Sequence, residues 1–253
     1  MLFDSIVYGP IRSRRLGVSL GMNLMSTTAK LCTFDCVYCE CGWNQPVSHP
    51  VLPTREQVRE ALASRLIALS PNQLDVITFS GNGEPTLHPE FLGIIEDTCA
   101  LRERYCPQAK ISVLSNSTQL GRADVVKALR MCDNRILKLD SAIDTTMRLI
   151  DKPVNENLTV EQVAEWLSLF EGDFTLQTCF LRGEYEGQVI DNTTPEELSA
   201  WYTMIERLRP KQVMIYVIDR ATPLQTLSKV PATEMEAIAA PLREKGIDVI
   251  VSA

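Results

Sequence analysis

The chain has 253 residues, a formal net charge of −7 and 45% hydrophobic residues. This length and apolar content are enough to bury a large core, and they favour a single domain over residues 1–253. No apolar run approaches the roughly 20 residues that a membrane-spanning helix needs, which excludes an integral membrane protein. The negative charge disfavours a protein that coats nucleic acid, although it leaves room for one local basic site.

The cysteine content points to metal or redox chemistry. The chain starts with the mixed segment Met-Leu-Phe-Asp, which does not resemble a signal peptide, so we expect a cytoplasmic protein. Eight cysteines in such a protein favour metal or redox sites over disulfides. Four cysteines are scattered through expected helices and strands and fit small apolar core residues: Cys99, Cys106, Cys132 and Cys179.

Strand and helix patterns alternate along the chain. Strand patterns cover residues 18–25, 75–80, 110–115, 135–140, 173–181, 212–218 and 248–252. Helix patterns begin at residue 53 and then cover 89–104, 122–131, 159–170, 194–208 and 233–245. Thr54 is a suitable N-cap for the first helix, and Pro195 occupies the first turn of the fifth. Strands separated by helices pair in parallel through right-handed crossovers, which predicts an α/β fold: a TIM-like barrel, partial or closed, or a doubly wound sheet.

The most informative stretch is Cys-Thr-Phe-Asp-Cys-Val-Tyr-Cys, which places cysteines at positions 32, 36 and 39. Cys32, Cys36 and Cys39 could hold three irons of a [4Fe-4S] cluster and leave the fourth iron open to a chelating cofactor. A zinc site is the alternative, with Cys41 or His49 as the fourth ligand. Structural zinc sites usually return with a second closely spaced pair of ligands, which this stretch does not do.

The cysteine stretch resembles the cluster-binding loop of the radical S-adenosylmethionine (SAM) superfamily. This resemblance implies that SAM chelates the open iron and is cleaved by one electron to methionine and a 5′-deoxyadenosyl radical. It also implies hydrogen abstraction from a substrate, and a reducing partner such as flavodoxin or ferredoxin. The fold that it implies is a partial (βα)6 TIM-like barrel with parallel strands.

The turn after the strand 75–80 resembles the GGEP motif of that superfamily. It reads Gly81-Asn82-Gly83-Glu84-Pro85, with Asn82 inserted between the two glycines. The resemblance implies that main-chain carbonyls and the Glu84 carboxylate hold the ammonium group of SAM. Glycines would let main-chain oxygens approach closely, and Glu84 would supply negative charge. A glycine-rich turn with a solvated Glu is the simpler alternative.

Tyr38 and Asn116 complete the expected surroundings of SAM. Tyr38 matches an aromatic residue that lies against the adenine in relatives, but it could equally pack the cysteine loop. Asn116 closes the strand 110–115, where relatives carry a Thr-Asn-Gly or Ser-Asn-Gly turn. This chain has Ser117 in place of the glycine, which leaves the shape of the turn open.

Three further polar residues stand on expected strands. Asp140 resembles the acidic residue that many relatives place near the SAM ribose or the substrate. Lys138 shares its strand face and could neutralise it or contact a carboxylate. Gln177 is a candidate for a hydrogen bond to SAM or substrate, and a buried Gln bonded to a neighbouring main chain is the alternative.

The substrate is not evident from the sequence. The segment Gly9-Pro10-Ile11-Arg12-Ser13-Arg14-Arg15-Leu16-Gly17 resembles the P-S-R-R-L-G signature of short radical SAM proteins related to wybutosine-synthesis enzymes, with Ile11-Arg12 in place of the usual Val-Pro. Its arginines, Arg12, Arg14 and Arg15, suit an anionic group or an ion pair with neighbouring acidic residues. A tRNA or nucleoside, a peptide or partner protein, and a small metabolite all stay open, as does a non-catalytic iron-sulfur or zinc protein.

Overall fold

The computed structural model describes residues 2–13, 15–47, 50–69 and 73–253. The chain divides into two compact units: Met1–Cys32 with Asn44–Ile136, and Thr33–Trp43 with Leu137–Ala253. The division therefore falls within the cysteine stretch, directly after Cys32. The expectation of one domain over residues 1–253 stays a prediction. No helix in the described part of the chain is both long and apolar enough to cross a membrane.

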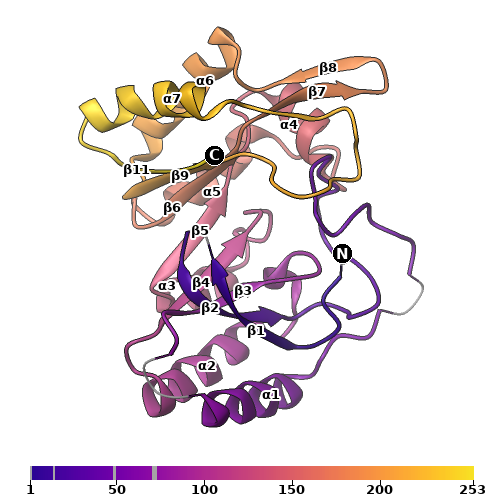
Figure 1. Cartoon of the computed structure of the whole chain (residues 1–253), viewed down its shortest axis with the longest axis vertical. Coiled ribbons are helices and arrows are strands. Elements are labelled where there is room, and N and C mark those ends of the chain that lie inside the picture. Colours follow the sequence, from indigo (N-terminus) through magenta and orange to yellow (C-terminus); the bar gives the residue numbers. More distant parts are fainter. Residues whose placement is uncertain (1, 14, 48–49, 70–72) are drawn as a thin grey trace. The chain divides into compact units, whose positions relative to one another are not determined.

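The first unit contains parallel strands alternating with helices (Figure 1). Its elements are β1 (Val7–Ser13), β2 (Gly17–Asn23), α1 (Arg55–Ala68), β3 (Val76–Ser80), the short 3-10 helix η1 (Pro85–Leu87), α2 (Phe91–Tyr105), β4 (Lys110–Ser115) and α3 (Ala123–Met131). Strand β2 pairs in parallel with β3, and β3 with β4. The predicted N-cap of α1 is confirmed, because the Thr54 side chain accepts from the Gln57 N–H in a capping box.

Strand β1 was not expected from the sequence. It pairs antiparallel with β2, and the register shifts between Tyr8 and Ile11. The segment contains Gly9 and Pro10, which weaken a strand pattern. An edge strand tolerates both residues, because only one of its sides needs hydrogen-bond partners.

The second unit also contains strands that alternate with helices, and its first element is a strand. Strand β5 (Asn134–Lys138) passes from the first unit into the second, where α4 (Asp144–Asp151), α5 (Val160–Ser168), β6 (Thr175–Cys179), β7 (Leu181–Tyr185), β8 (Gln188–Asp191), α6 (Pro195–Leu208), β9 (Gln212–Tyr216), β10 (Ser228–Lys229), α7 (Ala232–Glu244) and β11 (Asp248–Ser252) follow. Strand β9 pairs in parallel with both β6 and β11. The predicted start of α6 is confirmed, with Thr194 as N-cap and a proline in the first turn.

The fold class is the predicted one. The large sheet takes its strands in the order β1-β2-β3-β4-β5-β6-β9-β11, so its parallel strands follow chain order, as in a partial TIM-like barrel. A doubly wound sheet would instead reverse its strand order at a switch point. The expected strand at 173–181 is shorter than predicted, because the chain leaves the large sheet after Cys179. It then forms a separate antiparallel sheet of β7, β8 and β10.

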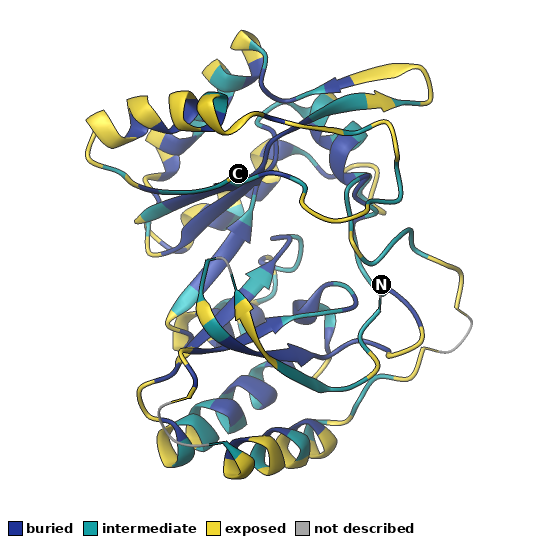
Figure 2. Cartoon of the chain, viewed as in Figure 1, coloured by how far each residue is buried: buried dark blue, intermediate teal, exposed yellow. Residues whose placement is uncertain are grey.

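Each unit has its own apolar interior (Figure 2). In the first unit, α1 buries Val58, Leu62 and Leu66, which lie four residues apart on one helix face. In the second unit, a cluster of fully buried side chains joins the cysteine stretch to β6, β7 and β8: Val37, Ile150, Cys179, Leu181 and Ile190. Val37 therefore anchors the cysteine stretch in the core of the second unit.

Candidate active site

The cysteine stretch of the second unit is fixed by main-chain pairing with α4 and the residues after it. The Val37 N–H donates to the Ile150 carbonyl at 2.9 Å, and the Val154 N–H donates to the Thr33 carbonyl at 2.9 Å. These bonds replace regular strand pairing in a segment without regular secondary structure. A loop held in this way keeps its side chains in fixed positions, as a binding site requires.

Two of the cysteines that we expect to bind the cluster lie on this loop. The Cys39 N–H donates to the Cys36 carbonyl at 3.0 Å, and the Gly42 N–H donates to the Cys39 carbonyl at 2.9 Å, so the loop closes in two tight turns. Cys36 is buried and Cys39 is half-buried, and both carry thiols rather than disulfides. Cys41 is half-buried on the same turn.

The ammonium group of Lys138 contacts the sulfur of Cys36 and two buried carboxylates. Its Nζ lies 3.0 Å from Cys36 Sγ, 3.0 Å from Asp140 Oδ2 and 2.5 Å from Asp151 Oδ1. The side chain of Lys138 is 11% exposed, while those of Asp140 and Asp151 are 0% and 2% exposed. The ion pair that the sequence predicted between Lys138 and Asp140 is therefore present. A second carboxylate, from the end of α4, joins it.

Burial and charge compete in this group. Burial disfavours the ammonium form of Lys138, but the carboxylates of Asp140 and Asp151 outweigh it and raise the lysine pKa well above its usual value. Burial also raises the pKa of Asp151, and the neighbouring Asp140 adds to that rise, while Lys138 opposes it. Two buried carboxylates thus lie beside one ammonium group, whose charged form they favour.

Tyr38 and Asp140 are bonded to each other. The Tyr38 hydroxyl donates a short hydrogen bond to Asp140 Oδ2, and Asp140 Oδ1 accepts from the Cys179 N–H at 2.8 Å. The ring of Tyr38 lies 4.8 Å from Lys138 Nζ, within range of a cation–π interaction. Both oxygens of Asp140 are therefore engaged within the second unit, where they fasten the end of β5 to β6. The contacts of Tyr38 with adenine and of Asp140 with ribose stay predictions.

Gln177 and Cys179 stand on β6. Gln177 is buried, and its Nε2 lies 3.6 Å from Met214 Sδ on the neighbouring strand β9. Cys179 is fully buried, and this burial raises the pKa of its thiol well above the usual value. A thiol in that state is a small apolar core residue, as the sequence suggested for most of the scattered cysteines. The contact of Gln177 with SAM or substrate stays a prediction.

In the first unit, the glycine-rich turn lies directly against the start of the cysteine stretch. The Leu31 N–H donates to the Asn82 carbonyl at 2.9 Å, and the Glu84 N–H donates to the Leu31 carbonyl at 3.0 Å. Gly83 has a φ of 141°, and a Cβ atom there would lie 1.8 Å from the Leu31 carbonyl oxygen. Only glycine allows this approach, so the turn and the residue before Cys32 are coupled through the main chain.

The inserted Asn82 holds the first unit together. Its side chain is fully buried, accepts from the Phe3 N–H at 2.7 Å, and donates to the carbonyls of Phe3 and Ser26 at 2.7 and 2.8 Å. Its own N–H donates to the Asn23 side chain at 3.0 Å. The side chain of Asn82 is thus engaged inside the protein, and the predicted contact of Asn82 with SAM stays a prediction.

The Glu84 carboxylate is also engaged by protein donors. Oε1 accepts from the N–H and hydroxyl of Thr86 at 3.1 and 2.5 Å and from the Ser115 hydroxyl at 2.9 Å, while Oε2 accepts from the Asn116 N–H at 2.7 Å. Glu84 is buried, and desolvation raises its pKa despite these four hydrogen bonds. The carboxylate therefore joins the glycine-rich turn to the end of β4.

Asn116 and Ser117 form the turn that follows β4. The Asn116 side-chain amide lies 3.4 Å from Cys32 Sγ, close enough for an N–H to donate to the sulfur. Ser117 has a φ of 70°, which is the left-handed conformation that glycine adopts easily. The shape expected of an Asn-Gly turn is thus kept with serine in the glycine position.

The donor set suits a cluster bound through cysteine thiolates. Cys32 is the last residue of the first segment of the first unit, and Cys36 and Cys39 follow it within seven residues along the chain. N–H donors stand beside the sulfurs of both Cys32 and Cys36. Donors of this kind stabilise thiolates and tune iron-sulfur clusters. Among the described residues, no three Cys, His, Asp or Glu side chains are already grouped as a metal site.

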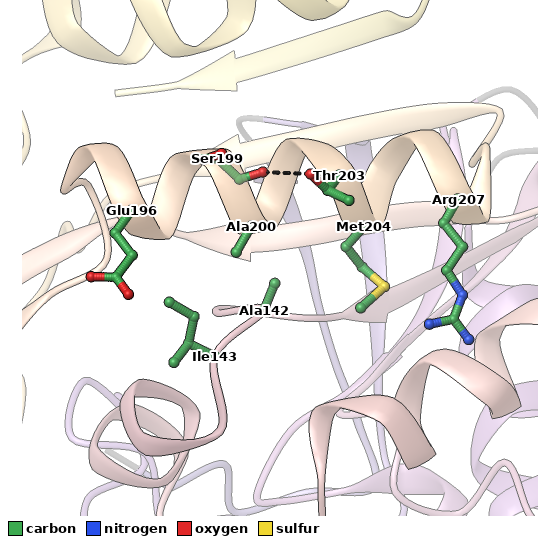
Figure 3. Close-up of a pocket in the computed structure, with 8 residues that line it drawn as sticks. All are labelled: Ala142, Ile143, Glu196, Ser199, Ala200, Thr203, Met204 and Arg207. Carbon is green, nitrogen blue, oxygen red and sulfur yellow. Dashed lines mark hydrogen bonds between the residues drawn. The ribbon is translucent and has the colours of Figure 1, made fainter.

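The second unit also contains a pocket on α6 (Figure 3). Its volume is about 470 Å³, and it is lined by Ala142, Ile143, Glu196, Ser199, Ala200, Thr203, Met204 and Arg207. The guanidinium of Arg207 pairs with Glu161, at 2.5 Å from Oε1. None of the lining residues was a predicted site residue.

Some predicted residues lie outside the described part of the chain, and one important residue was missed. Arg14 and His49 are not among the described residues. Asp151 was missed because it ends a helix that the sequence analysis did not predict, so nothing marked it as a partner of Lys138. An acidic residue near the end of a short amphipathic segment reads as a solvated side chain.

The comparison with protein families decides the class of this site. Residues 27–190, which include the three cysteines and most of the predicted SAM contacts, match the family model described as the radical SAM superfamily. The chain belongs to the radical SAM superfamily. Proteins of this superfamily are generally enzymes that use a [4Fe-4S] cluster and SAM. The sequence resemblance is thereby confirmed at the level of the family.

Individual relatives of this radical SAM protein, in sequence and in structure, are consistent with the family match. The UPF0026 protein slr1464 of Synechocystis is 31% identical over 226 residues, which cover 87% of this chain and 77% of the relative. The structure of TYW1 with a lysine-pyruvate adduct bound has a TM-score of 0.64 at 16% identity, over 89% of this chain and 73% of that one. Streptococcus suis SuiB bound to SAM gives a TM-score of 0.64 at 10% identity over 89% of this chain. The radical SAM protein spans about half the length of SuiB, and likenesses at such identity concern the fold alone.

Proposed function

We propose that this protein is a radical SAM enzyme that cleaves SAM reductively and abstracts hydrogen from a substrate. The observation that carries the proposal is the cysteine stretch within the matched family region, with N–H donors placed at the sulfurs of Cys32 and Cys36. Cys32, Cys36 and Cys39 would hold the cluster. When bound there, the cluster would supply the electron for the reductive cleavage of SAM.

The residues of this chain would position SAM and keep water away. The main chain of the Gly81–Glu84 turn would meet the ammonium group, while the Glu84 carboxylate keeps the turn and Asn116 in register. Tyr38 would lie near the adenine, and Asp140 and Gln177 would stand further along the strand ends. Burial of these polar residues provides the low dielectric that protects a carbon radical from stray hydrogen donors.

The experiment that tests this proposal is anaerobic. The protein is reconstituted with iron and sulfide, given dithionite and SAM, and assayed for 5′-deoxyadenosine. We expect product from the parent protein and none from the Cys36→Ala variant, because that variant lacks one cluster ligand. The Cys99→Ala variant is the matched control: Cys99 lies on α2, outside the site, and this variant should retain product formation.

Iron and acid-labile sulfide analysis separates the alternative function. A zinc-binding protein would be colourless and would contain no sulfide. An intact, reducible four-iron cluster without 5′-deoxyadenosine would leave two explanations, which SAM binding by calorimetry separates. Binding without cleavage indicates an enzyme that waits for its substrate, and no binding indicates an iron-sulfur binding protein.

The substrate and the reductant are further proposals. Flavodoxin or ferredoxin would supply the electron. SuiB has been solved with its precursor peptide and TYW1 with a lysine-pyruvate adduct bound, so a peptide substrate has a precedent on this fold. The net charge of −7 gives no support for a large RNA footprint, so a peptide or small metabolite is the better first choice for screening.

A further inference from the structure

The ammonium group of Lys138 lies beside the sulfur of Cys36. Its Nζ is 3.0 Å from Cys36 Sγ, which is the distance of a strong charge-assisted hydrogen bond. Both residues belong to the second unit, where Cys36 is held by the pairing of the cysteine stretch with α4. The contact is therefore part of the folded loop rather than a chance approach of a surface lysine.

The position of the ammonium group is fixed from several sides. Its Nζ donates to Cys36 Sγ, and the carboxylate oxygens Asp140 Oδ2 and Asp151 Oδ1 lie 3.0 and 2.5 Å from it as ion-pair partners. The rings of Phe34 and Tyr38 lie 5.1 and 4.8 Å from the same Nζ. These contacts hold the Lys138 side chain in one position, and it is only 11% exposed. Its charge therefore acts on the sulfur with little screening by water.

We propose that Lys138 is a positioning residue that raises the reduction potential of the cluster held by Cys36, and that Asp151 limits this effect. The inference rests on the proposed function, because it concerns the same cluster. Reduction adds one negative charge to a cluster, so a donor or cation at a ligand sulfur favours the reduced state. A nearby carboxylate acts with the opposite sign.

Asp151 is the better of the two carboxylates for testing this balance. Asp140 also accepts from the Tyr38 hydroxyl and from the Cys179 N–H, so a change there disturbs two strands. Asp151 lies at the end of α4, and its Oδ1 is 2.5 Å from Lys138 Nζ. Replacing Asp151 by Asn keeps the size of the side chain and removes the carboxyl group beside the ammonium group. Because burial raises the pKa of this carboxyl to about 7, the variants are compared above that pH, where the parent carboxylate is ionised.

The test is a redox titration of the reconstituted protein without SAM, followed by electron paramagnetic resonance of the reduced cluster. Iron and sulfide content is measured first for every variant. In Lys138→Met, we expect the ratio of reduced to oxidised cluster at a fixed potential to fall about tenfold, which is a shift of 59 mV for one electron. In Asp151→Asn, we expect the ratio to rise severalfold. In Lys138→Arg, which keeps the charge, the ratio should stay within about twofold of the parent.

The two opposite shifts distinguish this role from a structural one. A residue that only supports the loop would lower cluster content or leave the potential unchanged, and it would not give opposite signs for a lysine and its carboxylate partner. If Lys138→Met does not fold, Asp151→Asn and Lys138→Arg still decide the matter. A parent potential in Asp151→Asn, or a fall of the ratio in that variant, overturns the inference.

The outcome is separable from that of the proposed function. A parent protein with a reducible cluster but no SAM cleavage or SAM binding refutes the proposed enzyme, while the potentials of the variants still test Lys138. A parent that cleaves SAM, with variants that share its potential, refutes the role of Lys138 and leaves the enzyme intact. A parent that takes up no cluster refutes both.

Discussion

The Glu84 carboxylate accepts a hydrogen bond from the main-chain N–H of Asn116 at 2.7 Å. This bond joins the glycine-rich turn after β3 to the turn after β4, the two segments in which the family motifs of the first unit lie. Asn116 in turn donates from its side chain to Cys32 Sγ at 3.4 Å. Glu84, which the sequence suggests as a contact of SAM, therefore also holds the neighbouring turn in place.

Removal of the Glu84 side chain should destabilise the first unit. Glu84→Ala leaves the N–H groups of Thr86 and Asn116 buried without their acceptor, and each such loss costs about 1–3 kcal/mol. We expect the free energy of unfolding, measured by urea denaturation, to fall by at least about 2 kcal/mol. Glu103→Ala, an exposed position on α2, is the control and should change it by less than about 0.5 kcal/mol. Equal effects of the two variants would contradict the organising role of Glu84.

Gly83 allows a test of the close approach between the turn and Leu31. In Gly83→Ala the new Cβ would lie 1.8 Å from the Leu31 carbonyl oxygen, so the pairing of these segments must open. Gly187→Ala is the matched control, because Gly187 has a φ of 77° but no heavy atom within 4 Å of its ideal Cβ. Backbone strain alone costs roughly 1–2 kcal/mol. We expect Gly83→Ala to exceed that cost in urea denaturation and to lower iron uptake, and Gly187→Ala to leave iron uptake unchanged. Equal losses would show that strain, not contact, is the cause.

Much of the fold follows from local patterns in the sequence. The alternation of strands and helices, the Thr54 cap and the helix start at Pro195 depend on neighbouring residues, and they were predicted with small shifts in boundaries. Strand β1 and the hairpin β7–β8 were not predicted. Both depend on antiparallel partners that the local pattern does not reveal, and β1 contains Gly9 and Pro10.

In the candidate site, too, some features could be recognised from the sequence and others could not. The cysteine stretch and the glycine-rich turn were recognisable because their chemistry is local. The partnership of Lys138 with Asp151 and Cys36 was not, because these three residues come from a strand, a helix end and a loop. Likewise, the bonds of Asn82 to Phe3 and Ser26 required the folded chain, and they give a residue in a binding motif a structural role.

Ser117 carries a cost that glycine would remove. Its φ of 70° disfavours a side chain by roughly 1–2 kcal/mol, whereas glycine loses more entropy on folding. We therefore expect Ser117→Gly to change the free energy of unfolding by less than about 1 kcal/mol. Ser117→Val should lower it by more than about 2 kcal/mol, because position 117 is fully buried and a branched side chain fits the left-handed conformation poorly. Thermal denaturation of both variants would measure the difference. A valine variant as stable as the glycine variant would contradict the left-handed turn.

The ion pair between Arg55 and Asp97 should give the first unit a defined dependence on pH. The guanidinium on α1 donates to both carboxylate oxygens of Asp97 on α2 at 2.7 and 2.8 Å, and these hydrogen bonds lower the pKa of Asp97 below its usual value of 3.8. A lowered folded-state pKa means that the stabilisation is present above the unfolded pKa and is lost as pH falls through the folded one. Because Arg55 is 40% exposed, we expect Asp97→Asn to cost only about 0.5–1 kcal/mol at pH 7.

The effect of Asp97→Asn on stability should itself depend on pH. The difference in unfolding free energy between the parent and Asp97→Asn should shrink as pH is lowered below about 4, because the parent then loses the charge that the variant lacks. Glu60→Gln, at an exposed position on α1, should show no comparable difference at either pH. Urea denaturation at pH 7 and pH 3 measures both effects. A difference that grows at low pH would contradict the ion pair, because it would mean that protonated Asp97 contributes more to stability than its ionised form.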